Sequence, residues 1–220
     1  MQQRKPHIIV EGSLEYALGS LEGHKICYDF PKILTYLDAK GKLLFGTQFK
    51  IHEEDKAILF KLSNYFIRDF ENCRKAGIDP DKGILLSGPV GCGKTSLMKL
   101  LRHIVPHRKA YQIIPARNIA FAFNHIGYRI IEDYGDSNFY CFDDLGVEPL
   151  GRYFGKDCNV MGEVILSRYE LYLRNRILTH ATTNLNAMEL EERYGERVRS
   201  RMRQMFNLIA FDKESSDKRK

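Results

Sequence analysis

Residues 83–95, Gly-Ile-Leu-Leu-Ser-Gly-Pro-Val-Gly-Cys-Gly-Lys-Thr, decide the fold of this chain. From Gly88 to Thr95 they fit the phosphate-loop pattern G-x-x-x-x-G-K-[ST]. Such a loop turns several backbone N–H groups toward one anion, which requires glycine wherever a Cβ would block the approach. The helix that follows favours negative charge at its N-terminus, the lysine reaches the outer phosphates and the hydroxyl binds the metal ion.

The residues on either side of the loop support this interpretation. Ile84-Leu85-Leu86 is a short apolar run typical of a buried strand, and after Lys94 the leucines recur at helical spacing until Pro106. A glycine loop between a strand and a helix predicts a nucleotide site. The expected phosphate-binding residues are Gly88, Pro89, Val90, Gly91, Cys92, Gly93, Lys94, Thr95 and Ser96, and Thr95 is also expected on the metal ion.

The composition is that of an ordinary globular protein. Of 220 residues, 44% are hydrophobic and 28% charged, and five cysteines lie apart with no C-x-x-C pair, which disfavours a disulfide framework or a zinc site. No run of about 18 apolar residues occurs, and the start of the chain lacks a signal-peptide pattern, so we expect a cytoplasmic protein that does not enter membranes. The net charge of +6 permits a polyanionic partner.

The first 53 residues predict a small N-terminal element. Short helices are expected over Leu14–Leu21 and Pro31–Asp38, and a hairpin over Leu43–Ile51. From Glu54 to Ala76 the apolar spacing changes to that of one helix. We expect residues 54–211 to form the main domain and 212–220 a basic, solvated tail.

Strands and helices alternate along the rest of the chain. Tyr111–Pro115, Phe139–Phe142 and Ile177–Thr183 are expected as strands, and Arg117–Asp133 and Asn159–Arg174 as helices. Such alternation predicts an α/β fold with a central parallel sheet covered by helices on both faces. Ligands of such folds bind at the carboxyl ends of the strands.

Polar residues follow two of these strands. Asp143 and Asp144 come directly after Phe139–Phe142, where the first acid can hold a Mg²⁺ ion and the second can polarise a water. The alternative is a strand that ends in an acidic turn. Asn184 follows Ala181-Thr-Thr and can reach a γ-phosphate, although asparagine is also common in plain turns.

A basic helix is expected over Glu189–Phe206. Residues 193–203 carry five arginines, and Val198, Met202 and Met205 share one helix face. Arg197 and Arg201 flank that stripe on one side, and Arg199 and Arg203 on the other. This pattern suits a helix at a subunit boundary that presents an arginine to the neighbouring nucleotide, although the arginines could equally be solvated.

Aromatic and basic residues also interleave in one segment, a composition typical of single-stranded nucleic-acid platforms. Each aromatic residue alone would more often belong to a core. The expected contacts are Arg117, Phe121, Phe123, Tyr128 and Arg129.

Four motifs follow one another along the chain: the phosphate loop, Phe-Asp-Asp-Leu-Gly-Val-Glu, Ala-Thr-Thr-Asn-Leu and Arg-Tyr-Gly-Glu-Arg-Val-Arg-Ser-Arg-Met. Together they resemble the AAA+ ATPases of the DnaC/IstB type, which are replicative helicase loaders and transposition helper ATPases. The resemblance covers about residues 54–211. It implies a P-loop NTPase fold with little or no helical lid, and ATP and Mg²⁺ bound between subunits of a homo-oligomer. By similarity, Lys94 and Thr95 are Walker A and Asp143 and Asp144 are Walker B. Asn184 is sensor 1 and Arg201 the arginine finger, with Arg197 as the second choice.

Several functions are compatible with these motifs. The first is an ATPase that loads or remodels a replicative helicase on single-stranded DNA. The second is a helper that acts with a transposase on duplex DNA. A phosphate-loop phosphotransferase acting on a small metabolite and a nucleotide-dependent adaptor without hydrolysis are further alternatives, and the missing Asn-Lys-x-Asp motif disfavours a GTPase.

Overall fold

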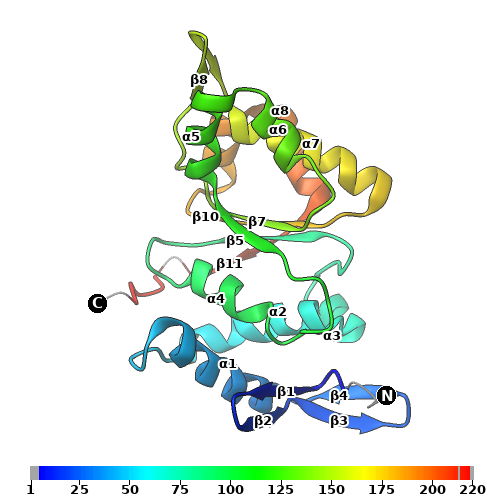
Figure 1. Cartoon of the computed structure of the whole chain (residues 1–220). Helices are drawn as coiled ribbons and strands as arrows, with labels where there is room; N and C mark the ends of the chain where they lie inside the picture. The colour runs from blue at the N-terminus through cyan, green and yellow to red at the C-terminus, as the bar shows by residue number, and fades with distance from the viewer. Residues whose placement is uncertain (1–4, 213, 219–220) are drawn as a thin grey trace. The chain divides into compact units, whose positions relative to one another are not determined.

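The computed structural model describes residues 5–212 and 214–218 (Figure 1). The chain divides into two compact units. The first unit holds the residues up to Pro80 together with Ser96–Ala110, and the second unit holds Asp81–Thr95 together with the residues from Tyr111 onward. The domain boundaries expected at residues 54 and 212 remain predictions. Within the described residues, no helix is both long and apolar enough to cross a membrane.

The first unit begins with two antiparallel hairpins. Strands β1 (Ile8–Glu11) and β2 (Leu14–Ala17) form one, and β3 (Gly19–Glu22) and β4 (Lys25–Tyr28) form the other. The helix expected over residues 14–21 is therefore wrong. Glycines at positive φ, 62° at residue 12 and 61° at residue 23, open both turns and favour a hairpin over a helix.

Helices complete the first unit. They are α1 (Phe30–Phe45), the short 3-10 helix η1 (Glu53–Asp55), α2 (Lys56–Ile67), α3 (Phe70–Lys75) and α4 (Lys94–Leu101), whose first two residues belong to the second unit. Leu43–Phe45 ends α1, so the hairpin expected there is wrong. The single helix expected over residues 54–76 is interrupted because Arg68 takes a left-handed φ of 60° and Asp69 caps a new helix.

The second unit is built on a five-stranded sheet in the order β11-β5-β10-β7-β6. Each neighbouring pair runs parallel, so the predicted parallel α/β sheet is confirmed. The strands are β5 (Gly83–Ser87), β6 (Gln112–Pro115), β7 (Tyr140–Leu145), β10 (Thr179–Thr183) and β11 (Phe206–Ala210). Strand β11 was not predicted, since Phe206 was expected to end a helix.

Four helices and a hairpin complete the second unit. The helices are α5 (Ala116–Ile126), α6 (Arg129–Tyr134), α7 (Val160–Asn175) and α8 (Ala187–Met205), and the hairpin joins β8 (Gly151–Tyr153) to β9 (Lys156–Cys158). Gly127, at φ 65°, separates α5 from α6, and Gly195, at φ 83°, kinks α8. Both interruptions fall inside segments that were expected to be single helices.

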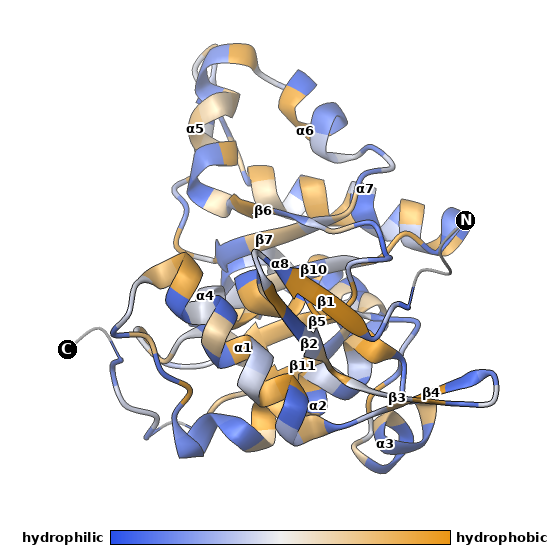
Figure 2. Ribbon diagram, turned by 60° about the horizontal axis from the view of Figure 1, so that its bottom comes forward, coloured by the Kyte–Doolittle hydropathy of each residue, from blue (hydrophilic) through white to orange (hydrophobic). Residues whose placement is uncertain are grey.

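One apolar core joins α5, α7 and α8 to strands β5, β7 and β10. Val198, Met202 and Met205 of α8 are all buried in it, as the helical stripe predicted. Figure 2 shows the apolar colour concentrated along the central strands. The core therefore holds the strands whose carboxyl ends carry the predicted polar residues.

A histidine lies inside this sheet. Nδ1 of His180, on β10, accepts a hydrogen bond from the backbone N–H of Ile84 at 3.1 Å, and its ring packs edge-on against Tyr111. Burial lowers the pKa of His180 to about 3. The folded chain therefore holds the neutral imidazole, because only that form has an acceptor nitrogen for Ile84.

We predict that His180 makes the chain sensitive to acid. An unfolded histidine has a pKa of about 6.5, so between that pH and the folded pKa the unfolded chain binds a proton that the folded chain excludes. Stability then falls as the pH falls. Between about pH 7.5 and pH 5, wild type should lose about 2 kcal/mol more unfolding free energy than His180→Asn, whose side-chain oxygen also accepts but does not titrate. Urea unfolding at the two pH values measures the unfolding free energy of wild type and of His180→Asn. Equal losses in the two proteins would contradict the neutral, buried state of His180.

Candidate functional site

The loop between β5 and α4 has the backbone that the sequence predicts. Gly91 and Gly93 take φ values of 84° and 100°, which side chains other than glycine rarely adopt. A Cβ at Gly88 would lie 2.7 Å from the Cβ of Phe211 and 3.1 Å from the sulfur of Cys92. Three of the loop positions therefore require glycine, two for conformation and one for space.

Lys94 is the cation of the loop. Its side chain is buried, and its ammonium donates to the carbonyl oxygens of Gly88 at 2.9 Å and Pro89 at 2.8 Å. It also donates to Oδ1 of Asn184 at 2.6 Å, which brings the candidate sensor onto the phosphate loop. Burial lowers the pKa of Lys94, while Asp143 and Asp144 nearby act to raise it. The Lys94 ammonium is therefore buried, and the oxygen atoms that accept its hydrogen bonds are all uncharged.

Asp143, at the end of β7, is the hub of the site. Its carboxylate accepts hydrogen bonds from the hydroxyl of Thr95 at 2.8 Å and from the hydroxyl of Thr182 at 2.7 Å. The Thr182 hydroxyl accepts in turn from the backbone N–H of Asp144 at 2.9 Å. Three strand or helix ends are therefore joined through one carboxylate. Thr182 was passed over in the sequence because threonine is ordinary in a strand.

The chain turns sharply after this carboxylate. Asp144 has a φ of 54°, in the left-handed region, and its side chain is half-buried. Glu148, four residues later, is buried and accepts from the backbone N–H of Gly146 at 2.8 Å and the hydroxyl of Tyr194 at 2.6 Å. Burial and Glu148 together raise the pKa of that tyrosine. Glu148 thus fastens the loop after the two acids to α8, a role that the sequence did not reveal.

The arginines of α8 differ in their surroundings. Arg201 is half-buried with its guanidinium 4.8 Å from the ring centre of Tyr169 on α7, and Arg197 is exposed. Arg199 is only 8% exposed, and burial lowers its pKa. The expectation of two matched basic edges is therefore wrong for Arg199, which faces the interior. Arg203 is exposed and pairs with Glu191 at 3.3 Å.

The segment expected to contact nucleic acid is only partly on the surface. Arg117, Phe121, Tyr128 and Arg129 are exposed, and the guanidinium of Arg117 lies 5.3 Å from the ring centre of Phe121. Phe123 is fully buried in the core. The expected base contact is therefore wrong for Phe123, because α5 turns that ring inward while Phe121, two residues earlier, points outward.

Phe211 and Lys218, near the C-terminus, contact the strand and loop that form the phosphate site. The backbone N–H of Phe211 donates to the carbonyl of Ser87 at 2.8 Å. Lys218 donates through its backbone to Gly91 at 3.1 Å and through its ammonium to the carbonyl of Cys92 at 2.9 Å. The described part of the tail is thus not simply solvated, as its charge had suggested. Lys218 of the tail packs directly against the phosphate loop.

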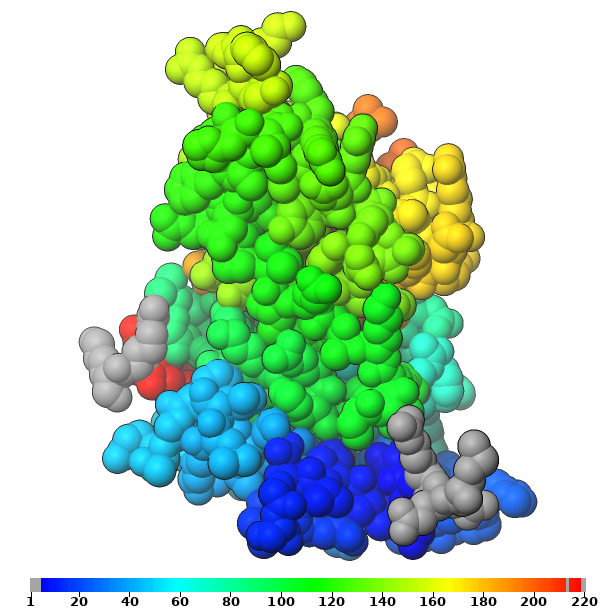
Figure 3. Space-filling model, viewed as in Figure 1, coloured from blue at the N-terminus to red at the C-terminus, as the bar shows by residue number. Residues whose placement is uncertain are grey.

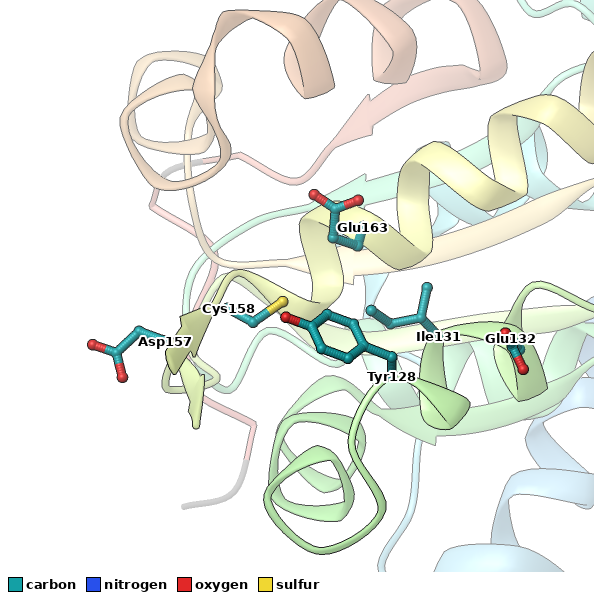
Figure 4. A pocket seen from close by; sticks show the side chains of 6 residues that line it. All are labelled: Tyr128, Ile131, Glu132, Asp157, Cys158 and Glu163. Carbon is teal, nitrogen blue, oxygen red and sulfur yellow. The ribbon is translucent and has the colours of Figure 1, made fainter. Parts of the chain in front are cut away.

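A separate pocket of about 390 Å³ lies beside the hairpin (Figure 4). Its lining residues are Tyr128, Ile131, Glu132, Asp157, Cys158 and Glu163. Three of these are carboxylates, so the pocket is unsuited to phosphates. It is distinct from the site around Lys94.

The fold has relatives among solved structures. The crystal structure of the DnaC helicase loader aligns with a TM-score of 0.54 and 20% identity, over 76% of this chain and 94% of that one. That of DnaI aligns with a TM-score of 0.54 and 17% identity, over 76% and 89%. The chain has the fold of the DnaC helicase loader. The predicted AAA+ fold of the DnaC type is thereby confirmed, and at these identities the likeness concerns the fold alone.

Sequence comparisons give shorter matches. No family model matches the chain. The proteasome-activating nucleotidases of Pyrococcus abyssi and Thermococcus onnurineus are each 61% identical over 31 residues. That stretch is 14% of this chain and 8% of the length of those curated relatives. The match is local and says nothing of their remaining length.

We predict that Thr182 holds the two acids in place. Thr182→Val keeps the side-chain shape but removes the hydroxyl, so the carboxylate of Asp143 loses a donor and the N–H of Asp144 loses its acceptor. A buried polar group left without its partner costs about 1–3 kcal/mol, and urea unfolding should show a loss of that size. Thr182→Ser retains the hydroxyl and should keep most of the stability. If valine and serine behave alike, the hydroxyl does not act as described.

Proposed function

We propose that this chain is an AAA+ ATPase that binds ATP with Mg²⁺ and loads or remodels a replicative helicase on single-stranded DNA. The observation that carries the nucleotide part is the buried ammonium of Lys94, whose direct oxygen partners are two carbonyls and one amide. A buried cation without a bonded anion is unfavourable, and a phosphate supplies that anion. The N–H groups of a glycine loop of this kind can bind the same phosphates.

The residues also fit a magnesium ion. The hydroxyl of Thr95 and the carboxylate of Asp143 lie 2.8 Å apart, and both are hard oxygen donors of the kind that Mg²⁺ prefers. When bound, the ion neutralises charge on the phosphates. Thr95 and Asp143 would hold it, and Thr182 would orient Asp143. Lys94 would exchange its carbonyl acceptors for phosphate oxygens.

Asp144 and Asn184 would position the attacking water. Asp144 is half-buried next to the metal-holding acid, and Asn184 is bonded to Lys94 at 2.6 Å, so both border the place where the outer phosphates would lie. A carboxylate can accept the proton of the water, and an amide can orient it. The strand order and the fold of the helicase loader support this ATPase hypothesis over a metabolite phosphotransferase.

The first test is the loss of Lys94. Lys94→Ala should abolish stabilisation by ATP and Mg²⁺, which for wild type reaches about 2.7 kcal/mol when the nucleotide is at about 100 times its Kd. Thermal unfolding with and without nucleotide measures it. Lys75→Ala is a matched control, because Lys75 is exposed and pairs with Glu71 on its own helix. Undiminished stabilisation in Lys94→Ala would refute this nucleotide site.

The partner is proposed from the fold. Because the chain shares the fold of the DnaC helicase loader, we assign it a replicative helicase and single-stranded DNA as partners. A transposition helper would instead respond to duplex DNA. Steady-state ATP hydrolysis should therefore rise with single-stranded DNA and much less with a duplex of the same sequence. The reverse order would favour the transposition function.

Arg201 is proposed to act on the ATP of a neighbouring subunit. Its guanidinium is held on the ring of Tyr169 at 4.8 Å, which restricts its motion without neutralising its charge. We predict that Arg201→Ala binds ATP normally but hydrolyses it about a thousandfold more slowly, the effect expected for an arginine supplied in trans. Nucleotide affinity and turnover are measured separately.

Mixing separates a trans arginine from one that acts within its own subunit. Arg201→Ala protein mixed with Lys94→Ala protein should regain part of the activity, because one subunit supplies an intact pocket and the other an intact arginine. If the mixture stays inactive while the two variants co-assemble, Arg201 is not the finger. Arg197→Ala is then the next variant to measure.

A further inference from the structure

The β8–β9 hairpin has a costly residue at its tip. Tyr153 pairs with Lys156, so Phe154 and Gly155 alone form the turn. Both have positive φ values, 47° and 77°, as in a type I′ turn. Such turns favour Asn, Asp or Gly, because the left-handed conformation is sterically unfavourable for other residues. Phenylalanine is therefore a poor choice for this turn.

The ring of Phe154 is also scarcely buried by the fold. It is 89% exposed, more than any other large hydrophobic side chain in the described part of the chain. In the space-filling view the hairpin projects from the rest of the second unit (Figure 3). Since neither the turn nor the core benefits from this side chain, we look for its role in a contact outside the chain.

The tip of the hairpin is fixed by contacts between the hairpin strands and α5. The ring of Tyr153 packs edge-on against Phe154, with centres 4.5 Å apart, and against the buried Phe123 at 6.1 Å. The backbone N–H of Arg152 donates to the side chain of Asn124 on α5 at 2.6 Å. A Cβ at Gly127 would lie 2.5 Å from the Tyr153 ring, so glycine is needed there for the hairpin to dock. The exposed ring is therefore presented by a preorganised support.

Cations flank the exposed ring. Arg152 and Lys156 are both exposed on the two strands beside the turn. Arg152 pairs with Asp157 at 3.7 Å, but both side chains are mostly exposed, so the pair is weak and easily exchanged for a phosphate. The carboxylates of Glu132 and Glu163 line the pocket at the hairpin base and repel a polyanion there. A polyanion is thus confined to the tip.

We propose that Phe154 stacks on an unpaired base of single-stranded DNA while Arg152 and Lys156 contact the adjacent phosphates. An aromatic face with cations on either side is the combination that binds single strands without sequence preference. Bases of an intact duplex are already stacked and do not offer a free face. This inference rests on the proposed function, and it assigns the strand to a hairpin that lies outside the segment predicted from the sequence.

The test replaces the ring without disturbing the turn. Phe154→Asn introduces a residue that the turn prefers, so the hairpin should be retained and the melting temperature should not fall. The affinity of this variant for a fluorescein-labelled oligothymidine, measured by anisotropy with ATP and Mg²⁺, should be about tenfold lower than that of wild type. The variant Phe154→Trp, which keeps an aromatic ring, should bind as tightly as wild type. Phe70→Ala, which removes an exposed phenylalanine of the first unit, should leave the affinity unchanged.

The salt dependence of DNA affinity tests whether Arg152 and Lys156 contact phosphates. In Arg152→Ala with Lys156→Ala, the slope of log affinity against log salt should be smaller by about 1.4, since each contact to a single-strand phosphate contributes about 0.7. An unchanged slope overturns their assignment to phosphates.

The possible outcomes separate this inference from the proposed function. If wild type binds the oligothymidine and Phe154→Asn binds it equally well, the hairpin inference is overturned and the proposed function stands. If wild type binds no single strand at all, both fail. If duplex DNA loses affinity as strongly as the single strand, base stacking is overturned. Retained ATP stabilisation in Phe154→Asn shows that the nucleotide site is intact in each case.

Discussion

One carboxylate fixes the geometry of the nucleotide site. Asp143 accepts hydrogen bonds from Thr95 at the start of α4 and from Thr182 on β10, so it joins the ends of three separate elements. The pairing of β7 and β10 alone would set their spacing, but not the direction of the side chains at their ends. The shared carboxylate sets that direction, because both hydroxyls donate to Oδ1 of Asp143. The glycine loop and Lys94 can therefore be aligned with Asp144 and Asn184 before any ligand binds.

The charge balance at the site favours an anion. Lys94 is buried among neutral acceptors, and the carboxylate of Asp143 is turned toward two hydroxyls rather than toward the Lys94 ammonium. The positive charge of Lys94 therefore lies against the carbonyls of the glycine loop, and the negative charge of Asp143 lies beside Thr95. A ligand that carries both phosphates and a divalent cation matches both halves of this arrangement.

The sequence was informative where chemistry depends on short local patterns. The phosphate loop, the Asp143–Asp144 pair and the parallel sheet could be predicted because glycines, strand-ending acids and alternating periods are local signals. The broken helices were missed because apolar spacing alone was followed: Gly127 and Gly195 are local signals for a break, whereas Arg68 at a left-handed φ carries none. Phe123 was misassigned because exposed and buried aromatics alternate on α5. Strand β11 begins directly where α8 ends, so Phe206 was included in the helix, and the three-residue strands β8 and β9 are too short to carry a detectable period.

One cysteine allows the hairpin to be labelled chemically. All five lie in the described residues; Cys73, Cys92 and Cys141 are buried, whereas Cys27 and Cys158 are half-buried. Cys158 ends β9 opposite Gly151, at the foot of the hairpin. Replacing Cys27 by serine would leave Cys158 as the main thiol open to a maleimide fluorophore. Burial raises the pKa of Cys158, so conjugation should proceed faster in mildly alkaline buffer. The native chain thus carries a labelling position beside its most exposed aromatic ring.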